Sequence, residues 1–343
     1  MICADSMNDA ITSVCSYRVT LLKWMTQDLT ALRRLPNYHV HLLSDYKEYM
    51  SRLNICIRHN QEVLKLIAEG SATFPTVKKV SLKKDEQEKI FMLFALIMRD
   101  WSVTGATERS QCYEPVIDAL VSRFTGCQTA SSSSSCKPKV IVPGAGLCRL
   151  AVELAVRGFK VEANENCPIL LLFLSFLLGS SGKNLDVNSL KLYPWLHQTS
   201  NLLSREIQFT SIKFPDMEIG KVVEQCEIGI VPGCFLQNYH NVDESFDAVA
   251  SVFFLDTAKN PLDYLSAYWK ILKPGGYWIE LCPLTFHHSD GLPLSWQMLK
   301  KAAQKKGFIL EEEKQLADIS YAQNAGSMLV YRYDAVFAIF KKQ

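Results

Sequence analysis

The sequence lacks the features that mark several large classes of protein. Neither sign of charge is in excess, because the 343 residues include 37 basic and 35 acidic ones. A broad basic field for binding nucleic acid is therefore absent. The longest strongly apolar run, Ile169–Leu178, is about half the length that a bilayer-spanning helix needs. We expect no nucleic-acid partner and no membrane span, and we interpret this run as a buried helix.

Paired cysteines are also missing. The 11 cysteines are scattered, none stands three residues from another as CxxC, and their number is odd. Asp5 and Asp9 interrupt the N-terminus, where a secretory leader would be apolar. This pattern favours reduced, buried thiols over disulfides or a metal site, and it predicts a cytoplasmic protein.

The composition is that of a globular protein, with 48% hydrophobic residues and a mean hydropathy of +0.02. Apolar residues at helical spacing between 46 and 67 predict a long helix, and further helices are predicted over 85–101 and 114–124. A serine-rich stretch follows and is interpreted as a linker. We expect a helical N-terminal region (1–128), the linker (129–137) and a second domain (138–343).

After the linker, short β-branched runs alternate with helical stretches, which predicts an α/β fold with a mostly parallel sheet between helices. The last two predicted strands have no helix between them and are expected to form an antiparallel edge. The predicted strands are 140–142, 159–163, 227–231, 246–254, 277–281, 307–312 and 331–341, and the predicted helices are 147–157, 169–178 and 261–272.

A glycine turn lies between the first predicted strand of this domain and the helix that follows. Gly144 and Gly146 permit a tight turn and let a ligand approach the backbone and the helix N-terminus. Glu165 follows the next strand, where an acid can accept hydrogen bonds from the ribose of a nucleotide-like cofactor. The alternative is a plain strand–helix turn with a solvent-facing glutamate.

The turn favours S-adenosylmethionine over a dinucleotide. Arg149 stands where the dinucleotide fingerprint requires a third glycine, and S-adenosylmethionine carries no phosphate. The segment Lys273-Pro-Gly-Gly is similar to one found before the fifth strand of class I methyltransferases. A nicotinamide-dependent dehydrogenase is the weaker alternative.

Four polar residues are expected to converge at the carboxyl edge of the sheet, where ligands bind in open α/β folds. Asp256 and His287 each follow a predicted parallel strand, and Tyr331 and Tyr333 begin the final antiparallel one. Each has a structural alternative: the aspartate as a helix cap, the histidine as a loop residue and the tyrosines as core residues.

This set of residues suits methylation of a ring nitrogen. An imidazole is mostly neutral at pH 7, so no strong base is needed. A carboxylate that accepts the N–H of one ring nitrogen leaves the other as a nucleophile and stabilises the imidazolium that forms. We assign this role to Asp256, and the tyrosines are expected to hold the ring and its developing charge.

Segments spread over nearly all of the chain match one known family: Arg34-Leu-Pro, Ile57-Arg-His-Asn-Gln-Glu, Arg99-Asp-Trp-Ser, Glu108-Arg, Cys112-Tyr-Glu-Pro, Val142-Pro-Gly-Ala-Gly-Leu-Cys-Arg-Leu-Ala, Asn164-Glu165, Phe253-Phe-Leu-Asp-Thr-Ala-Lys-Asn, Pro283-Leu-Thr-Phe-His287 and Tyr331-Arg-Tyr333. In these segments the chain resembles the carnosine N-methyltransferase family of class I methyltransferases. The Arg99-Asp-Trp-Ser and Phe253-Phe-Leu-Asp-Thr-Ala segments are far more specific than the glycine turn.

The resemblance implies methyl transfer from S-adenosylmethionine to the imidazole of carnosine and related histidine dipeptides, giving anserine, with some activity on histidine in proteins. It also implies N-terminal helices that form a lid over the active site. The expected location is the cytoplasm, and the sequence leaves open a further nuclear location and a homodimer. The implied cofactor residues are Arg99, Gly144, Gly146, Glu165, Cys234 and Phe235, and the implied substrate residues are Asp256, His287, Tyr331 and Tyr333.

Four positions depart from the family pattern. Leu96 replaces a glutamine, Cys234 replaces an aspartate and Cys282 replaces a glycine. Cys148 replaces a third glycine, and its side chain is expected to crowd the turn. All the implied substrate residues remain, so we expect an active enzyme with reduced cofactor affinity. A protein-histidine methyltransferase and a catalytically silent binding module are the alternatives.

Overall fold

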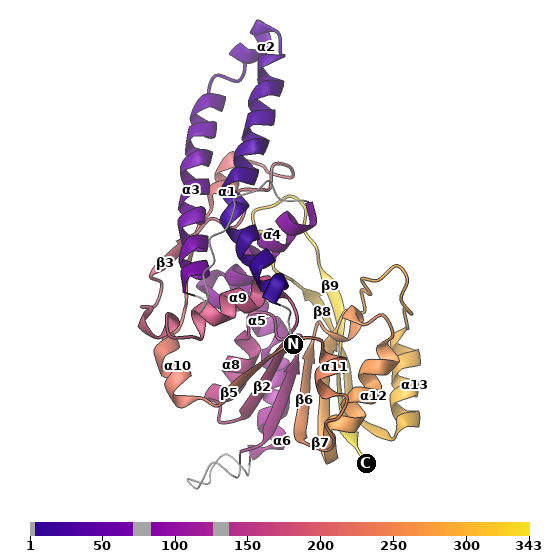
Figure 1. Ribbon diagram of the computed structural model, residues 1–343. Helices are drawn as coiled ribbons and strands as arrows, with labels where there is room; N and C mark the ends of the chain where they lie inside the picture. Colours follow the sequence, from indigo (N-terminus) through magenta and orange to yellow (C-terminus); the bar gives the residue numbers. More distant parts are fainter. Residues whose placement is uncertain (1–3, 71–83, 126–136) are drawn as a thin grey trace.

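A computed structural model describes residues 4–70, 84–125 and 137–343. The predicted linker, 129–137, lies outside these residues except for Lys137. A seven-stranded sheet forms the centre of the molecule, and a long pair of helices, α1 (Ala4–Arg33) and α3 (Tyr46–Glu69), projects away from it, joined by the short α2 (Asn37–His41) (Figure 1).

The sheet has the strand order β5-β2-β1-β6-β7-β9-β8. The first five strands pair in parallel, and β9 runs antiparallel to both β7 and β8, so the predicted mixed sheet is confirmed. Its strands are β1 (Lys139–Pro143), β2 (Lys160–Glu165), β5 (Ile228–Pro232), β6 (Phe246–Val252), β7 (Leu272–Cys282), β8 (Phe308–Ile319) and β9 (Tyr333–Lys342).

Helices cover both faces of this sheet, because alternate strand residues point to opposite sides. On one face, Val140 and Val142 of β1 pack in a cluster with α6 (Glu114–Arg123) and α8 (Arg149–Val156). On the other face, Ile141 packs in a cluster with α11 (Phe235–Tyr239), α12 (Pro261–Ile271) and α13 (Trp296–Lys306). The central strands are thereby buried on both sides, as expected for parallel strands.

A further apolar cluster joins the N-terminal helices to the sheet domain. It contains side chains from α1, α3, α4 (Lys84–Trp101) and α9 (Pro168–Leu177), which is the predicted buried apolar helix. The two-stranded sheet of β3 (Leu190–Leu192) and β4 (Ile212–Phe214) and the helix α10 (Ile219–Gln225) pack into the same cluster. The cluster thus spans the predicted boundary at 128, and the domain division itself stays a prediction.

The remaining short helices connect these layers. They are η1 (Val103–Gly105), α5 (Ala106–Cys112), η3 (Gly182–Asn184), η4 (Arg205–Phe209) and η5 (Leu255–Thr257). Among the described helices, no single one is long and apolar enough to cross a bilayer; α4 taken with Val103–Cys112, bent by 79°, meets that criterion by length and composition.

Some local predictions differ from the structure. The segment from Lys273 to Gly276, between the predicted helix 261–272 and the predicted strand 277–281, lies inside β7, where it forms an irregularity in the register with β6. Helix α13 was not predicted, although Ser295 caps it by accepting a hydrogen bond from the amide of Met298. Tyr331 precedes β9, which begins at Tyr333.

Candidate active site

The glycine turn links β1 to α8 at the carboxyl edge of the sheet. Gly144 and Gly146 have φ values of 59° and 57°, in the left-handed region that favours glycine. A Cβ atom on Gly144 would lie 2.2 Å from the ring of Phe254, so only glycine fits there. Cys148 also adopts this conformation, with φ 61°, but its side chain is fully buried in the core and does not line the cavity described below.

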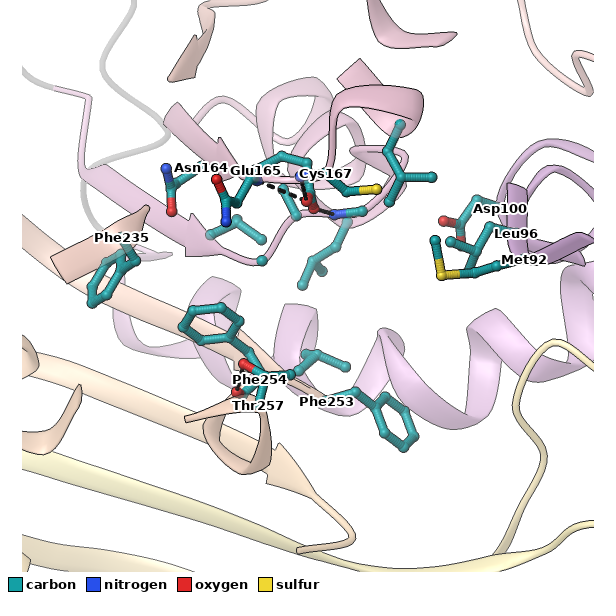
Figure 2. Close-up of a pocket in the computed structure, with 18 of the residues that line it drawn as sticks. Met92, Leu96, Asp100, Asn164, Glu165, Cys167, Phe235, Phe253, Phe254 and Thr257 are labelled. Carbon is teal, nitrogen blue, oxygen red and sulfur yellow. Dashed lines mark hydrogen bonds between the residues drawn. The ribbon is translucent and has the colours of Figure 1, made fainter. Parts of the chain in front are cut away.

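Glu165, at the end of β2, closes the turn from the opposite side. One carboxylate oxygen accepts a hydrogen bond of 2.8 Å from the amide of Gly146, and the other accepts bonds of 2.8 Å from the amides of Asn166 and Cys167. Burial raises the pKa of this carboxyl, and the three amides partly offset that effect. Glu165 therefore holds the glycine turn in place, and it also lines the cavity described below (Figure 2).

Helix α4 is attached directly to the residues that follow the glycine turn. The indole N–H of Trp101 donates a 3.0 Å hydrogen bond to the carbonyl of Leu147. The guanidinium of Arg149 donates a 2.7 Å bond to the carbonyl of Asp100. Both bonds are buried, so the end of α4 is held in a fixed position beside the turn.

Arg99, next to these anchors, is a buried cation with few polar partners. Its side chain is only 5% exposed, Asp100 lies 3.9 Å from its Nε, and that Nε has no hydrogen-bond partner among the residues that the structure describes. The guanidinium carbon lies 4.5 Å from the ring centre of Tyr321 and 4.9 Å from that of Tyr113. Burial opposes the charge, but Tyr113 and Asp100 hold the pKa of Arg99 above its usual value.

These elements enclose a cavity of about 530 Å³, a volume within the range of ligand pockets. Helix α4 forms one wall with Met92, Leu96 and Asp100, and the other walls include the ends of β2 and β6 (Figure 2). All six residues that the sequence assigned to the cofactor line it: Arg99, Gly144, Gly146, Glu165, Cys234 and Phe235. Two of the departures from the family pattern, Leu96 and Cys234, also line it.

Asp256 lies in η5, just beyond the end of β6, and is 2% exposed. Its Oδ2 accepts a 2.8 Å hydrogen bond from the amide of Thr285, and its Oδ1 has no partner within the described part of the chain. The structural alternative of a helix cap does not apply, because Asn260 caps α12 by accepting a hydrogen bond from the amide of Leu262. A buried carboxylate oxygen without a donor is costly, which makes this atom a candidate ligand-binding group.

The other predicted substrate residues differ in their surroundings. The ring of Tyr333 lies 6.4 Å from that of Phe253, so the start of β9 is at the same edge as Asp256. His287 is exposed, two residues beyond the Thr285 amide that binds Asp256. Tyr331 is 59% exposed. The structure thus places Asp256 and Tyr333 at one edge without a described contact between them, and no described contact joins His287 or Tyr331 to either residue. None of the four is among the residues that line the cavity.

Sequence reasoning assigned no role to two aromatic residues of this site. Phe253 and Tyr321 both line the cavity, with ring centres 4.8 Å apart, and both lie over Arg99. Phe253 has φ 53°, a strained conformation for a bulky residue and one that is typical of functional sites. Tyr321 belongs to an irregular segment between β8 and β9, where no periodic pattern marks it.

The strand order with its reversed β9, and the cavity at the carboxyl ends of the parallel strands, define a class I S-adenosylmethionine-dependent methyltransferase. A sequence model of the family described as carnosine N-methyltransferase matches residues 76–343. The chain belongs to the carnosine N-methyltransferase family, whose methyl donor is S-adenosylmethionine.

Relatives from several organisms carry the name carnosine N-methyltransferase. The Mus musculus protein is 32% identical over 90% of this chain and 79% of its own length. The Drosophila melanogaster protein, named carnosine N-methyltransferase unmet, is 32% identical over 88% of this chain and 72% of its own length. The Schizosaccharomyces pombe protein is 29% identical over 96% and 88%, respectively.

Proposed function

We propose that this chain transfers a methyl group from S-adenosylmethionine to an imidazole nitrogen of carnosine or a related histidine dipeptide, giving anserine from carnosine. Membership of the family supports the reaction class. The observation that carries the assignment to this chain is the buried, unpartnered Oδ1 of Asp256 at the carboxyl edge of the sheet. An imidazole N–H is a donor that this oxygen lacks.

The residues around the cavity fit S-adenosylmethionine. The buried guanidinium of Arg99 matches the carboxylate of the methionine portion, and the glycine turn leaves backbone open to close approach. Glu165 has oxygen lone pairs for ribose hydroxyls, and Phe235 offers an aromatic wall for the base. When bound, this donor supplies a methyl group on a positively charged sulfur.

Asp256 would select the reactive form of the substrate ring. By accepting the N–H of one ring nitrogen, its Oδ1 fixes the tautomer in which the other nitrogen has a free lone pair. The bond from this nitrogen to the methyl carbon forms as the carbon–sulfur bond breaks, so the ring becomes positively charged. A fixed carboxylate beside the ring stabilises that charge without reorganising. Tyr333 and Phe253 supply aromatic surface at the same edge.

The direct test is mass spectrometry of carnosine incubated with the purified protein and S-adenosylmethionine. We expect a singly methylated product, and we expect Asp256→Asn to lower kcat by about 100-fold or more, because the neutral amide offers no charge to the ring. Asp290→Asn is the matched control, since Asp290 is an exposed aspartate in the same loop region that pairs with Lys259. Equal turnover by the wild-type and Asp256→Asn proteins would refute the role of Asp256, and no methylated carnosine from the wild-type protein would refute the proposed reaction.

Histidine within peptides is a second candidate substrate. The segment just before Tyr333 exposes apolar side chains that could contact residues flanking a histidine: Met328, Leu329, Val330 and Tyr331. We expect a histidine-containing peptide to be methylated more slowly than carnosine when both are assayed side by side. A cytoplasmic and nuclear location and a homodimer stay predictions.

A further inference from the structure

The carbonyl groups at the end of α4 are bound by side chains from other parts of the chain. The last carbonyls of a helix have no partner within it, so they need donors from elsewhere. The guanidinium of Arg109, from α5, donates hydrogen bonds of 2.6 Å to the carbonyl of Arg99 and 2.7 Å to that of Ser102. The bond from Arg149 to the carbonyl of Asp100 supplies a third donor. Positive charge at this end of a helix is also favoured by the helix dipole.

Asp216 joins these two arginines from the connection between β4 and α10. Its Oδ2 accepts a 2.6 Å hydrogen bond from Arg109, and its Oδ1 accepts one of 2.5 Å from Arg149. Its own amide donates a 3.0 Å bond to the carbonyl of Trp101. The three charged side chains are between 6% and 12% exposed, so water screens their charges little. We call Arg109, Arg149 and Asp216 the helix-end clamp.

Within the helix-end clamp, Arg109 depends on Asp216 more than Arg149 does. Arg149 has a second acid, because its Nε donates a 2.9 Å hydrogen bond to Glu153. Among the described residues, Arg109 forms an ion pair with Asp216 only. Removing one partner of a buried ion pair leaves a charge that the interior does not tolerate. We therefore expect Arg109 to move away from the carbonyl of Arg99 when Asp216 loses its charge.

We propose that Asp216 is a positioning residue for S-adenosylmethionine, because the helix-end clamp fixes the backbone from which Arg99 reaches the cavity. This inference rests on the placement of the donor carboxylate at Arg99 in the proposed function. Asp216 does not line the cavity, so it acts through Arg99. Hydrogen bonds weaken steeply as their distance and angle depart from the optimum. A shift of Arg99 therefore weakens the contact with the carboxylate more than contacts elsewhere in the cavity.

The test compares the binding of two ligands to the wild-type protein and to Asp216→Asn by calorimetry. S-adenosylhomocysteine carries the carboxylate, and 5′-methylthioadenosine lacks it. Asparagine has nearly the same shape as aspartate, but its amide nitrogen faces one arginine as a second donor, so one arm of the helix-end clamp is lost. We expect the Kd of S-adenosylhomocysteine to rise about 3- to 10-fold, which corresponds to one hydrogen bond, and that of 5′-methylthioadenosine to stay unchanged.

A double variant separates positioning of Arg99 from a general weakening of the cavity. Arg99→Met removes the group through which Asp216 acts. Adding Asp216→Asn to Arg99→Met should therefore weaken the binding of S-adenosylhomocysteine no further. A purely structural role would weaken the binding of both ligands, and its effect would add to that of Arg99→Met.

Asp247→Asn is the matched control. Asp247 also binds two partners, the side chain of Lys273 and the amide of Lys139, but it lies at the amino edge of the sheet and does not line the cavity. This variant should unfold at a lower urea concentration with both Kd values unchanged. If Asp216→Asn does not fold, Arg109→Lys replaces it, since one ammonium cannot span Asp216 and the helix carbonyls as the guanidinium does. The same selective loss is expected.

The outcomes distinguish the two proposals. Unchanged binding of S-adenosylhomocysteine, equal losses for both ligands or an additive loss in the double variant overturns the role of Asp216. Unchanged binding of S-adenosylhomocysteine by Arg99→Met overturns the placement of the donor carboxylate and the role of Asp216 with it. If these binding results are as expected but carnosine is not methylated, only the proposed reaction is overturned.

Discussion

Arg99 offers the sharpest test of how the cavity holds its methyl donor. The change Arg99→Met removes the guanidinium but keeps a long, unbranched side chain beside Tyr113 and Tyr321. This guanidinium is buried, and none of residues 4–70, 84–125 and 137–343 forms a hydrogen bond with its Nε. Asp100 lies 3.9 Å from this Nε, beyond hydrogen-bond distance, so a ligand carboxylate would add a charge-assisted hydrogen bond.

The expected loss of affinity follows from that contact. A buried hydrogen bond to a charged group contributes about 1.5–3 kcal/mol, which corresponds to a 10- to 150-fold change in Kd. We expect Arg99→Met to weaken the binding of S-adenosylhomocysteine, the demethylated donor, by that factor. Binding of 5′-methylthioadenosine should not change, because this analogue keeps the adenosine and lacks the carboxylate.

Isothermal titration calorimetry with both ligands measures the two affinities directly. Unchanged binding of 5′-methylthioadenosine shows that the cavity of the variant is intact. Arg52→Met is the matched control, because Arg52 also lies over an aromatic ring, that of Phe209, but does not line the cavity. If Arg99→Met bound S-adenosylhomocysteine as tightly as the wild-type protein does, our placement of the ligand carboxylate would be wrong.

Three further changes probe other parts of the structure. Trp101→Phe leaves the carbonyl of Leu147 without its donor, so the free energy of unfolding should fall by about 1–3 kcal/mol in urea titrations. Cys234→Asp should tighten S-adenosylhomocysteine binding about 2- to 10-fold by restoring a polar group to the cavity wall, and an unchanged Kd would contradict this. His197 stacks on Phe91, and burial lowers its pKa from 6.5 to about 4. As the pH falls, this imidazole is therefore protonated in the unfolded chain at a higher pH than in the folded protein. Stability should therefore decrease from pH 6.5 to 4, and it should decrease less in His197→Phe.

The sequence predicted the sheet and the glycine turn because both depend on local patterns. Alternating strands and helices, with a final pair of strands lacking a helix between them, were sufficient for a mixed sheet with a reversed strand. Gly144, Gly146 and Glu165 stand at characteristic positions relative to the first two strands of the domain. These spacings reflect backbone geometry, which is the same in every chain of this fold.

The surroundings of the site could not be predicted in the same way. The environment of Arg99 depends on Tyr321, more than 200 positions away, and on the packing of α4 against the glycine turn. Helix α13 was not predicted because only two of its side chains, Leu299 and Ala303, are buried, so it has little periodic apolar pattern.

The two hydrogen bonds that join the end of α4 to the residues after the glycine turn have a thermodynamic consequence. Any ligand that orders the turn must also favour the docked position of α4, and by reciprocity a docked α4 must raise the affinity for the ligand. Amide hydrogens throughout the N-terminal helices should therefore exchange more slowly with deuterium when the methyl donor is bound, including those far from the donor.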